Sequence, residues 1–374
     1  MKISIVTSAP LTEPVVRNRL FPFFEVFQQH GYKVRCICPQ SDFNVEHLPE
    51  GVTLEQVVID FVKPRSFVKR ALKEAKDASS LLDRAKALGD EQVLVTIPSM
   101  FLALFAPIYL RKTVPLIDIR DLSWEYLAEN FLIQRLAKRL FRIWFKHSIG
   151  FFKLVAATNE TEVAYIRNLD KKIDPLLITN GIRRQQFQQL QNTLPSAEKK
   201  LTVAYIGNVG LAQRLDTLVE AARRLPEIQF NIVGSGIDES RVRDLIKRYR
   251  LENVEMTGRV SWECVLKYYD SAHYLYAQLA PEFSGAMPSK LYEYLSTGKS
   301  VIYGGCGQAV EILNQFDGCH VIKPCDPAVL AEKLLELHEG IDRQVLFVTN
   351  REVIEKKYVR ENAAKLLVER AASI

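Results

Sequence analysis

Residues 202–222 read TVAYIGNVGLAQRLDTLVEAA and join three local signals in a row. Thr202–Ile206 is a short, mostly apolar run that predicts a strand, and Gly207 and Gly210 predict a turn after it. From Leu215 to Leu225 the apolar residues recur at the spacing of a helix. A strand that leads through a turn into a helix is the unit of a parallel sheet covered by helices.

The same alternation of short apolar runs and helical segments extends through most of the 374 residues. Val15–His30 and Asp238–Leu251 are two further segments with helical spacing. At roughly 100–200 residues per domain, the length predicts two domains. The predicted strands are Ile3–Thr7, Lys33–Ile37, Val93–Thr96, Val114–Ile119, Lys153–Ala156 and Leu176–Thr179 in the first half, and Thr202–Ile206, Gln229–Val233, Val254–Thr257, Tyr274–Ala277, Ser300–Tyr303 and His320–Ile322 in the second.

The spacing of these strands favours two separate sheets over one barrel. Each half holds six predicted strands, whereas a barrel of eight units would spread its strands evenly along the chain. Between the halves lies the polar stretch 183–200, RRQQFQQLQNTLPSAEKK, whose composition is typical of an interdomain linker. We therefore expect an α/β protein with two doubly wound parallel sheets, in which ligands bind beyond the carboxyl ends of the strands.

The charge and the cysteine spacing indicate which kinds of partner and site the chain can have. The net charge is +6, from 50 basic and 44 acidic side chains, and residues 1–200 carry 29 basic and 21 acidic side chains, a net of +8. The first half is therefore the better candidate for meeting an anionic partner. The six cysteines form no Cys-x-x-Cys pair, so neither structural zinc nor a redox dithiol is expected.

No segment predicts a membrane span or a secretion signal. The first ten residues, MKISIVTSAP, lack the apolar core of a signal peptide and predict a strand. The longest apolar stretch, Ile97–Leu110, has 14 residues, fewer than the ~20 that cross a bilayer. We therefore expect a cytoplasmic protein.

Four segments that follow predicted strands in the second half have the residues that phosphate groups require. Lys290 would lie in the first turn of a predicted helix, where the helix dipole disfavours a cation unless an anion compensates it. Glu293 lies on the same helix face. Each segment alone also fits ordinary turn chemistry, and Lys290 also fits a solvated helix end. Together they indicate a nucleotide with a diphosphate; the segments are Gly207–Gly210, Gly234–Gly236, Pro288–Lys299 and Gly304–Gly307.

In the first half, the sequence DIRDL at 118–122 places three charges at the end of a predicted strand. These charges either form a structural ion pair or face a cleft. Arg17 and Arg19, at the start of the first predicted helix, are a second candidate contact for an anion.

The segment 130–153 is both basic and aromatic. From Phe131 onward it reads FLIQRLAKRLFRIWFKHSIGFFK, with six basic and no acidic side chains. Such a pattern fits a helix that lies on an anionic membrane surface, and it equally fits a core helix with a basic solvated face. We expect no binding of nucleic acid, because no known nucleic-acid motif accompanies these charges.

Several stretches resemble the retaining glycosyltransferases of family 4, which have the GT-B fold: ITNGI at 178–182, YIGNVGLAQRLDTLVEAA at 205–222, IVGSG at 232–236, NVEMTGRVSWE at 253–263 and MPSKLYEYLSTGKSVIYGG at 287–305. The order and spacing match across nearly the whole chain, most strongly in residues 175–335. The forms DIRDL and PSKLYEYLSTGK resemble the sub-branch that builds bacterial colanic acid, capsule and O-antigen, which includes N-acetylfucosamine transferases.

The resemblance implies two Rossmann-like domains that face a cleft. Residues 1–183 would bind the acceptor, residues 184–350 would bind a nucleotide sugar, and residues 351–374 would return to the first domain as a C-terminal helix. The donor is usually a UDP-sugar, and no metal or other cofactor is expected. The implied donor-binding residues are Gly207, Asn208, Gly210, Arg214, Gly234, Gly236, Arg259, Lys290 and Glu293.

Lys290 is also implied to be catalytic, together with Arg120 and Asp121, while Arg17 and Arg19 would contact the acceptor. Three positions depart from the family pattern. Gly285 stands where the family has the first of two glutamates, with Glu282 close by. Arg120 stands where a histidine is common, and Gln213 and Arg214 stand near the position of a lysine.

The function expected on these grounds is transfer of a sugar, with retention, from a UDP-sugar to a polyprenyl-diphosphate-linked glycan at the inner face of the cell membrane. The product would belong to a bacterial capsule or O-antigen. Two alternatives stay open: a non-catalytic subunit that binds nucleotide sugars, and a UDP-sugar 2-epimerase with the same fold.

Overall fold

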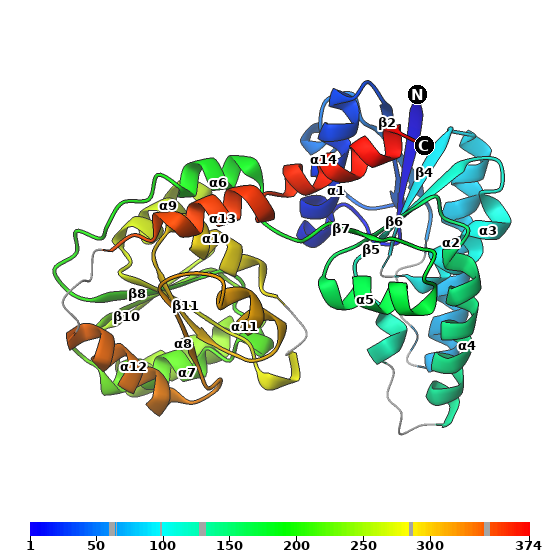
Figure 1. The fold of residues 1–374 in the computed structure, drawn as a ribbon. Coiled ribbons are helices and arrows are strands. Elements are labelled where there is room, and N and C mark those ends of the chain that lie inside the picture. Colours follow the sequence, from blue (N-terminus) through cyan, green and yellow to red (C-terminus); the bar gives the residue numbers. More distant parts are fainter. Residues whose placement is uncertain (60–63, 65, 98, 127–131, 284–286, 340–344) are drawn as a thin grey trace. The chain divides into compact units, whose positions relative to one another are not determined.

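The structure is a computed structural model that describes residues 1–59, 64, 66–97, 99–126, 132–283, 287–339 and 345–374. The chain forms two compact units. Unit 1 comprises residues 1–180 and 360–374, and unit 2 comprises residues 181–359. Each unit is built around one parallel sheet with helices on both faces (Figure 1). The chain therefore has the predicted α/β fold of two parallel-sheet domains.

Unit 1 contains a sheet of seven described strands in the order β3-β2-β1-β4-β5-β6-β7, all paired in parallel. The central strand β4, QVLVTI, is buried along its whole length, which explains why its sequence is almost continuously apolar. The strands are β1 (Lys2–Thr7), β2 (Lys33–Pro39), β3 (Thr53–Val57), β4 (Gln92–Ile97), β5 (Val114–Ile119), β6 (Leu154–Ala157) and β7 (Leu176–Leu177).

The two faces of this sheet are covered by different helices. α1 and α14 pack together on one face, where Phe23, Phe27 and Leu367 belong to the same buried cluster (Figure 1). The other helices pack on the opposite face. The helices of unit 1 are α1 (Pro14–Gln29), α2 (Phe67–Leu88), α3 (Met100–Tyr109), α4 (Leu132–Ile149), α5 (Glu160–Leu169) and α14 (Arg360–Ala372).

Unit 2 contains a sheet of six described strands in the order β10-β9-β8-β11-β12-β13, again all parallel. Helices α7, α8 and α12 contribute buried residues to one face, and α6, α9, α10, α11 and α13 to the other. The strands are β8 (Thr202–Ile206), β9 (Gln229–Val233), β10 (Val254–Gly258), β11 (Tyr274–Gln278), β12 (Ser300–Gly304) and β13 (Cys319–Ile322).

The helices of unit 2 begin and end at residues with recognisable signals. The Ser261 hydroxyl caps α9 by accepting a hydrogen bond from the backbone N–H of Cys264, and Gly298 ends α10 in a left-handed conformation. The helices are α6 (Arg184–Leu190), α7 (Asp216–Arg224), α8 (Glu239–Tyr249), α9 (Trp262–Ser271), α10 (Ser289–Thr297), α11 (Gln308–Leu313), α12 (Pro327–Glu339) and α13 (Val348–Tyr358).

The structure differs from the sequence expectations in three places. The first sheet has a seventh strand, β3, beyond the six predicted. Part of the expected linker at 183–200 forms α6, because Phe187 and Leu190 are buried in the core of unit 2. The expected C-terminal helix is two helices, α13 in unit 2 and α14 in unit 1, and the chain crosses between the units at 180/181 and 359/360.

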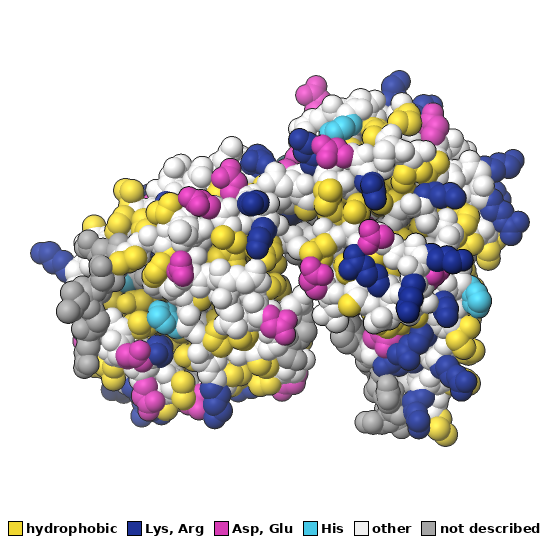
Figure 2. Space-filling view, viewed as in Figure 1, with side chains coloured by type: hydrophobic (Ala, Val, Ile, Leu, Met, Phe, Trp, Pro, Cys, Tyr) yellow, Lys and Arg dark blue, Asp and Glu magenta, His cyan; other side chains and the backbone are white. Residues whose placement is uncertain are grey.

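Helix α4 carries three different faces. Phe145 and Ile149 lie on the buried face, and the side chains of Arg135, Arg139, Arg142 and Lys146 form a basic stripe beside it. The face opposite the core is apolar yet exposed, and Figure 2 shows hydrophobic and basic side chains together where α4 lies. The exposed apolar residues are Leu132, Ile133, Leu136, Leu140, Ile143 and Trp144.

Among the described residues, no helix is both long and apolar enough to span a bilayer.

Candidate functional site

The glycine loops after β8 and β9 are bonded to one another in unit 2. The backbone N–H of Gly207 donates to the carbonyl of Val233 at 2.8 Å, and that of Val209 donates to Ser235 at 3.0 Å. The N–H of Asp238 donates back to the carbonyl of Val209 at 3.0 Å. These bonds place the segments 207–210 and 234–236 side by side at the carboxyl ends of their strands.

The glycines are required by this close approach. A Cβ atom on Gly234 would overlap the carbonyl of Gly207, and one on Gly236 would overlap the carbonyl of Val209. Gly207 and Gly234 also have φ angles of +143° and +138°, which side chains disfavour. Gly234 and Gly236 therefore make room for the backbone of the loop after β8, and Gly207 makes room for the side chain of Lys290.

Lys290 lies in the first turn of α10 and packs against the Gly207 loop. Its Nζ atom sits 3.7 Å from the centroid of the Tyr205 ring and donates to the Tyr205 hydroxyl, which donates to the carbonyl of Asn208. A Cβ atom on Gly207 would lie 2.9 Å from that Nζ. Burial lowers the pKa of Lys290 to about 7, although the charge of Glu293 opposes the shift. The lysine is therefore held half-buried beside the loop.

Glu293 lies one turn further along α10. Its Oε2 atom accepts a hydrogen bond from the hydroxyl of the buried Tyr269 on α9, at 3.0 Å. Burial, followed by the charge of Glu293, raises the pKa of that tyrosine, so Tyr269 remains a hydrogen-bond donor. The hydrogen bond from Tyr269 thus holds the Glu293 carboxylate in place. Its predicted partner, a ribose diol, remains a prediction.

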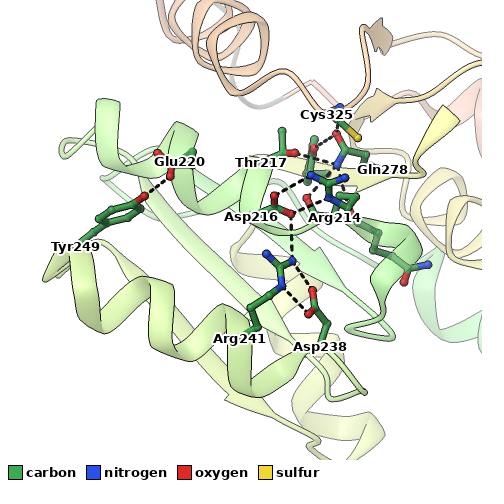
Figure 3. A network of polar contacts seen from close by, with 11 residues as sticks. Arg214, Asp216, Thr217, Glu220, Asp238, Arg241, Tyr249, Gln278 and Cys325 are labelled. Carbon is green, nitrogen blue, oxygen red and sulfur yellow. Dashed lines mark hydrogen bonds and ion pairs between the residues drawn. The ribbon is translucent and has the colours of Figure 1, made fainter.

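Arg214 takes part in a network that the sequence analysis did not foresee (Figure 3). It has a left-handed backbone (φ +43°), and its guanidinium pairs with Asp216 at 3.2 Å. Asp216 also pairs with Arg241 at 3.2 Å, and Arg241 pairs with Asp238 at 2.6 Å. Burial opposes ionisation of Asp216, but the hydrogen bonds from both arginines hold its pKa below the usual value. One edge of the Arg214 guanidinium is therefore paired with Asp216, while 48% of the side chain stays exposed.

Gln278 at the end of β11 holds the backbone of the Arg214 turn (Figure 3). Its side-chain amide donates to the carbonyls of Gln213 and Arg214 at 3.1 and 3.0 Å, and its oxygen accepts from the backbone N–H of Cys325 at 2.8 Å. A lone glutamine at a strand end gives no recognisable sequence signal. The left-handed backbone of Arg214, which Gln278 supports, is likewise not indicated by the sequence.

Backbone hydrogen bonds connect the other implied donor residues, or their direct neighbours in sequence, to these loops. Gly210 donates its N–H to the Gln213 side chain at 3.1 Å, and Asn208 is exposed between the two glycines. The backbone N–H of Gly234 donates to Gly258 at 2.9 Å, directly before the exposed Arg259. Unit 2 thus brings the implied donor residues to the carboxyl edge of one sheet. Gly285 lies outside the described residues.

The four implied residues of unit 1 fall into two groups. Arg19 is only 4% exposed, and it forms an ion pair with Asp118 on β5 while donating to the carbonyls of Ile178 and Thr179. Of the two interpretations of the 118–122 charges, the structural ion pair therefore applies to Asp118, with Arg19 as its partner. This geometry favours a structural role for Arg19 over contact with an acceptor. Arg17 donates to the carbonyls of Leu11 and Thr12 at 2.6 and 2.8 Å.

Arg120 and Asp121 lie directly after β5 and are half-buried. Among the described residues, the Arg120 guanidinium has no ion pair, and the Oδ1 atom of Asp121 has no hydrogen-bond partner. Burial lowers the pKa of Arg120, and burial also raises the pKa of Asp121 against the opposing charge of Arg120. Two neighbouring polar groups with unused hydrogen-bonding capacity are typical of a binding site. Within the described ranges, His, Cys, Asp and Glu side chains nowhere gather in threes as metal ligands.

Three comparisons relate this geometry to known proteins. Residues 186–352 match the sequence profile of the family "Glycosyl transferases group 1". A 181-residue stretch is 27% identical to WcaI of Escherichia coli K12, a protein named for glycosyl transfer in colanic acid biosynthesis. That match covers 47% of this chain and 43% of WcaI, so it spans less than half of that relative.

Solved structures of other proteins share the fold. Sucrose-phosphate synthase of Thermosynechococcus elongatus superposes with a TM-score of 0.73 at 18% identity, covering 100% of this chain and 98% of the other. Anabaena HepE in complex with UDP and glucose superposes with a TM-score of 0.67 at 15% identity over 100% of both chains. The chain thus has the GT-B fold, and its residues 186–352 match the profile of the glycosyl transferases group 1 family.

Proposed function

We propose that this chain transfers a sugar from a UDP-sugar to an acceptor hydroxyl, and that unit 2 binds the donor. The observation that carries the proposal is the half-buried Lys290 ammonium beside the Gly207 loop, within the domain that matches the group 1 profile. A cation at a helix start is unfavourable on its own, and a diphosphate at the same place would compensate it. HepE, a protein of the same fold, has been solved with UDP bound.

The chemistry needs charge neutralisation more than it needs a nucleophile. In a reaction with retention, the acceptor hydroxyl attacks the anomeric carbon from the side on which the diphosphate leaves. The bond between that carbon and the phosphate oxygen breaks, and the departing oxygen takes the hydroxyl proton. Lys290, Arg214 and the backbone N–H groups of the 207–210 loop would stabilise the growing negative charge. No metal ion is needed in this scheme, because groups of the chain supply the positive charge.

The remaining assignments follow from residue chemistry and are proposals of the same kind. Glu293, anchored by Tyr269, would accept hydrogen bonds from the ribose hydroxyls, and Arg259 would lie near the base. Arg120 and Asp121, with their unused hydrogen-bonding capacity, would orient acceptor hydroxyls. A glycan acceptor of a surface polysaccharide is supported by the name of WcaI, and a polyprenyl diphosphate anchor is supported by the surface of α4.

Thermal unfolding with a panel of nucleotides tests donor binding. A ligand at 100 times its dissociation constant should add about 2.7 kcal/mol to stability, so UDP should raise the unfolding temperature of the chain. CDP, GDP and ADP at equal concentration serve as matched controls. If UDP and UDP-sugars gave no shift while another nucleotide did, the UDP assignment would be wrong. Incubation of the chain with UDP-sugars and lipid extract then distinguishes transfer from binding alone, and omission of the acceptor reveals an epimerase.

We also propose that the exposed apolar face of α4 contacts an anionic membrane surface. Leu136 and Leu140 are 59% and 56% exposed, and they lie beside Arg135, Arg139 and Lys146 of the basic stripe. This is the arrangement of a helix that lies in the plane of a bilayer interface: apolar side chains enter the lipid, and the basic side chains beside them meet anionic headgroups.

The double variant Leu136→Glu/Leu140→Glu should abolish flotation of the chain with vesicles that contain anionic phospholipid. Both side chains are exposed, so the folded state should tolerate the change. The control is Leu194→Glu/Leu335→Glu, which adds the same charges at exposed leucines of unit 2 and should float like the parent. Equal flotation of all three proteins, or equal flotation of the parent with neutral and anionic vesicles, would rule out this surface.

A further inference from the structure

The carboxyl group of Glu162 is buried in unit 1 and has no role in the reaction as proposed above. Glu162 is the third residue of α5 and is 7% exposed. Its Oε2 atom accepts hydrogen bonds from the backbone N–H of Thr158 at 3.2 Å and from the Thr158 hydroxyl at 2.9 Å. Part of this arrangement is ordinary helix capping, since Asn159 accepts from the Glu162 backbone N–H at 2.8 Å. Capping does not explain the contacts of the hydroxyl.

The Thr158 hydroxyl lies within hydrogen-bond distance of two acceptors. One is Oε2 of Glu162, and the other is the backbone carbonyl of Arg120 at 3.2 Å. A hydroxyl has a single proton and can donate only one full hydrogen bond. If Glu162 is ionised, the carboxylate takes that proton, because charge-assisted bonds are the stronger ones. The carbonyl of Arg120 then loses its donor.

A protonated Glu162 resolves the competition. Its carboxyl O–H can donate to the oxygen of Thr158, and the Thr158 proton is then free for the carbonyl of Arg120. The surroundings favour this state: burial, with the charges of Asp121 and Asp118 adding to it, raises the pKa of Glu162 to about 7 against the opposing bonds from Thr158. Of the cations nearby, Arg19 is engaged by Asp118, and Arg120 lies on the loop itself.

We propose that Glu162 is a positioning residue that, while it holds a proton, fixes the Arg120–Asp121 segment through the Thr158 hydroxyl. This inference rests on the proposed function, in which Arg120 and Asp121 orient the acceptor. The side chain of Glu162 itself touches no substrate. It acts by keeping the backbone of Arg120 tied to the end of β6, so that the guanidinium and the neighbouring carboxylate keep one orientation.

The test is the pH profile of kcat/KM for the acceptor, measured for the parent and for Glu162→Gln. In the parent, ionisation of Glu162 should lower kcat/KM as the pH rises above 7, with a slope that approaches roughly tenfold for each further pH unit. The variant cannot ionise, and its amide can donate to Thr158 at every pH. The ratio of variant to parent should therefore rise by roughly 15-fold between pH 7 and pH 8.5. Titration of Lys290 is common to both proteins and cancels in this ratio.

Two variants at Thr158 keep the test decisive if Glu162→Gln folds poorly. Thr158→Ser retains the hydroxyl and should behave like the parent. Thr158→Val removes it and should lower kcat/KM for the acceptor below pH 7 while leaving the affinity for UDP unchanged, because the donor residues lie in unit 2. A constant ratio of Glu162→Gln to parent across this range, or equal profiles for the serine and valine variants, would overturn the inference.

An infrared difference spectrum separates this inference from the proposed function. The parent at pH 6 should show the carbonyl stretch of a protonated carboxylic acid that is missing from Glu162→Gln and fades as the pH rises above 7. If the parent transfers no sugar but shows this band, the proposed function fails while the protonated carboxyl stands. If the parent is active without the band, the inference fails alone. If both are missing, both fail.

Discussion

Lys290→Ala should lower the turnover number of sugar transfer by roughly 100- to 1000-fold, or about 3–4 kcal/mol of transition-state stabilisation. The ammonium group lies beside the Gly207 loop, where we expect the departing diphosphate to bind. Removing one preorganised donor from such a place leaves the developing charge without its main cationic partner. Steady-state kinetics on purified protein, with unfolding temperature as a check on folding, measure the effect.

The matched controls are Lys290→Met, which keeps the length of the side chain without its charge, and Lys267→Ala, which removes an exposed lysine from α9. The methionine variant should be as inactive as the alanine variant yet should unfold no more readily than the parent, because burying the ammonium is itself unfavourable. Lys267→Ala should be fully active. Normal turnover by folded Lys290→Ala would remove Lys290 from the catalytic group.

The protonation state of Lys290 adds a second readout. With a pKa lowered to about 7, roughly half of the molecules carry a neutral amine at pH 7. A bound diphosphate would favour the ammonium form, so UDP binding at this pH should take up as much as half a proton, roughly. UDP affinity should also fall as the pH rises above 7. Calorimetry in buffers of different ionisation enthalpy measures the uptake, and Lys290→Met should abolish it.

Asp118→Ala should destabilise unit 1 by about 3–5 kcal/mol, because it leaves the Arg19 guanidinium buried without its counter-charge. Arg19 would keep the carbonyls of Ile178 and Thr179 as hydrogen-bond acceptors and the ring of Phe23, but none of these carries a negative charge. Replacing both members of the pair, as in Arg19→Met/Asp118→Leu, should recover much of the loss, since apolar residues of similar volume need no counter-charge.

Urea unfolding followed by tryptophan fluorescence measures this change in unit 1 alone. The chain has three tryptophans, of which Trp124 and Trp144 lie in unit 1 and Trp262 in unit 2. In a Trp262→Phe background the signal therefore reports unit 1. If Asp118→Ala unfolded like its parent and instead weakened the acceptor KM, the ion pair would be a substrate contact, as the sequence analysis first proposed for Arg19.

The sequence predicts the strands well where they are continuously apolar, as in β4 and β8. It misses β3, TLEQV, because this edge strand is only half-buried and carries polar residues within its five positions. It misses α6 because only Phe187 and Leu190 stand out in a run of glutamines. The break at Val359 between α13 and α14 contains neither glycine nor proline, so the sequence does not predict it.

For the candidate site, the sequence predicts residue types at strand ends but not their partners. Lys290 and Glu293 follow from helix spacing and dipole arguments, and both lie at the carboxyl edge of the second sheet. The pairing of Arg19 with Asp118 joins residues 99 positions apart, and no local pattern signals it. Glu162 looks like an ordinary helix-capping residue until its burial and the second acceptor of the Thr158 hydroxyl are seen.

The decisive experiment is a crystal structure of the chain with bound UDP. We expect the two phosphates to lie within hydrogen-bond distance of the backbone N–H groups of the 207–210 loop and of the Lys290 ammonium, with the ribose against Glu293. A nucleotide bound away from these residues, with Lys290 still directed only at Tyr205, would contradict this expectation.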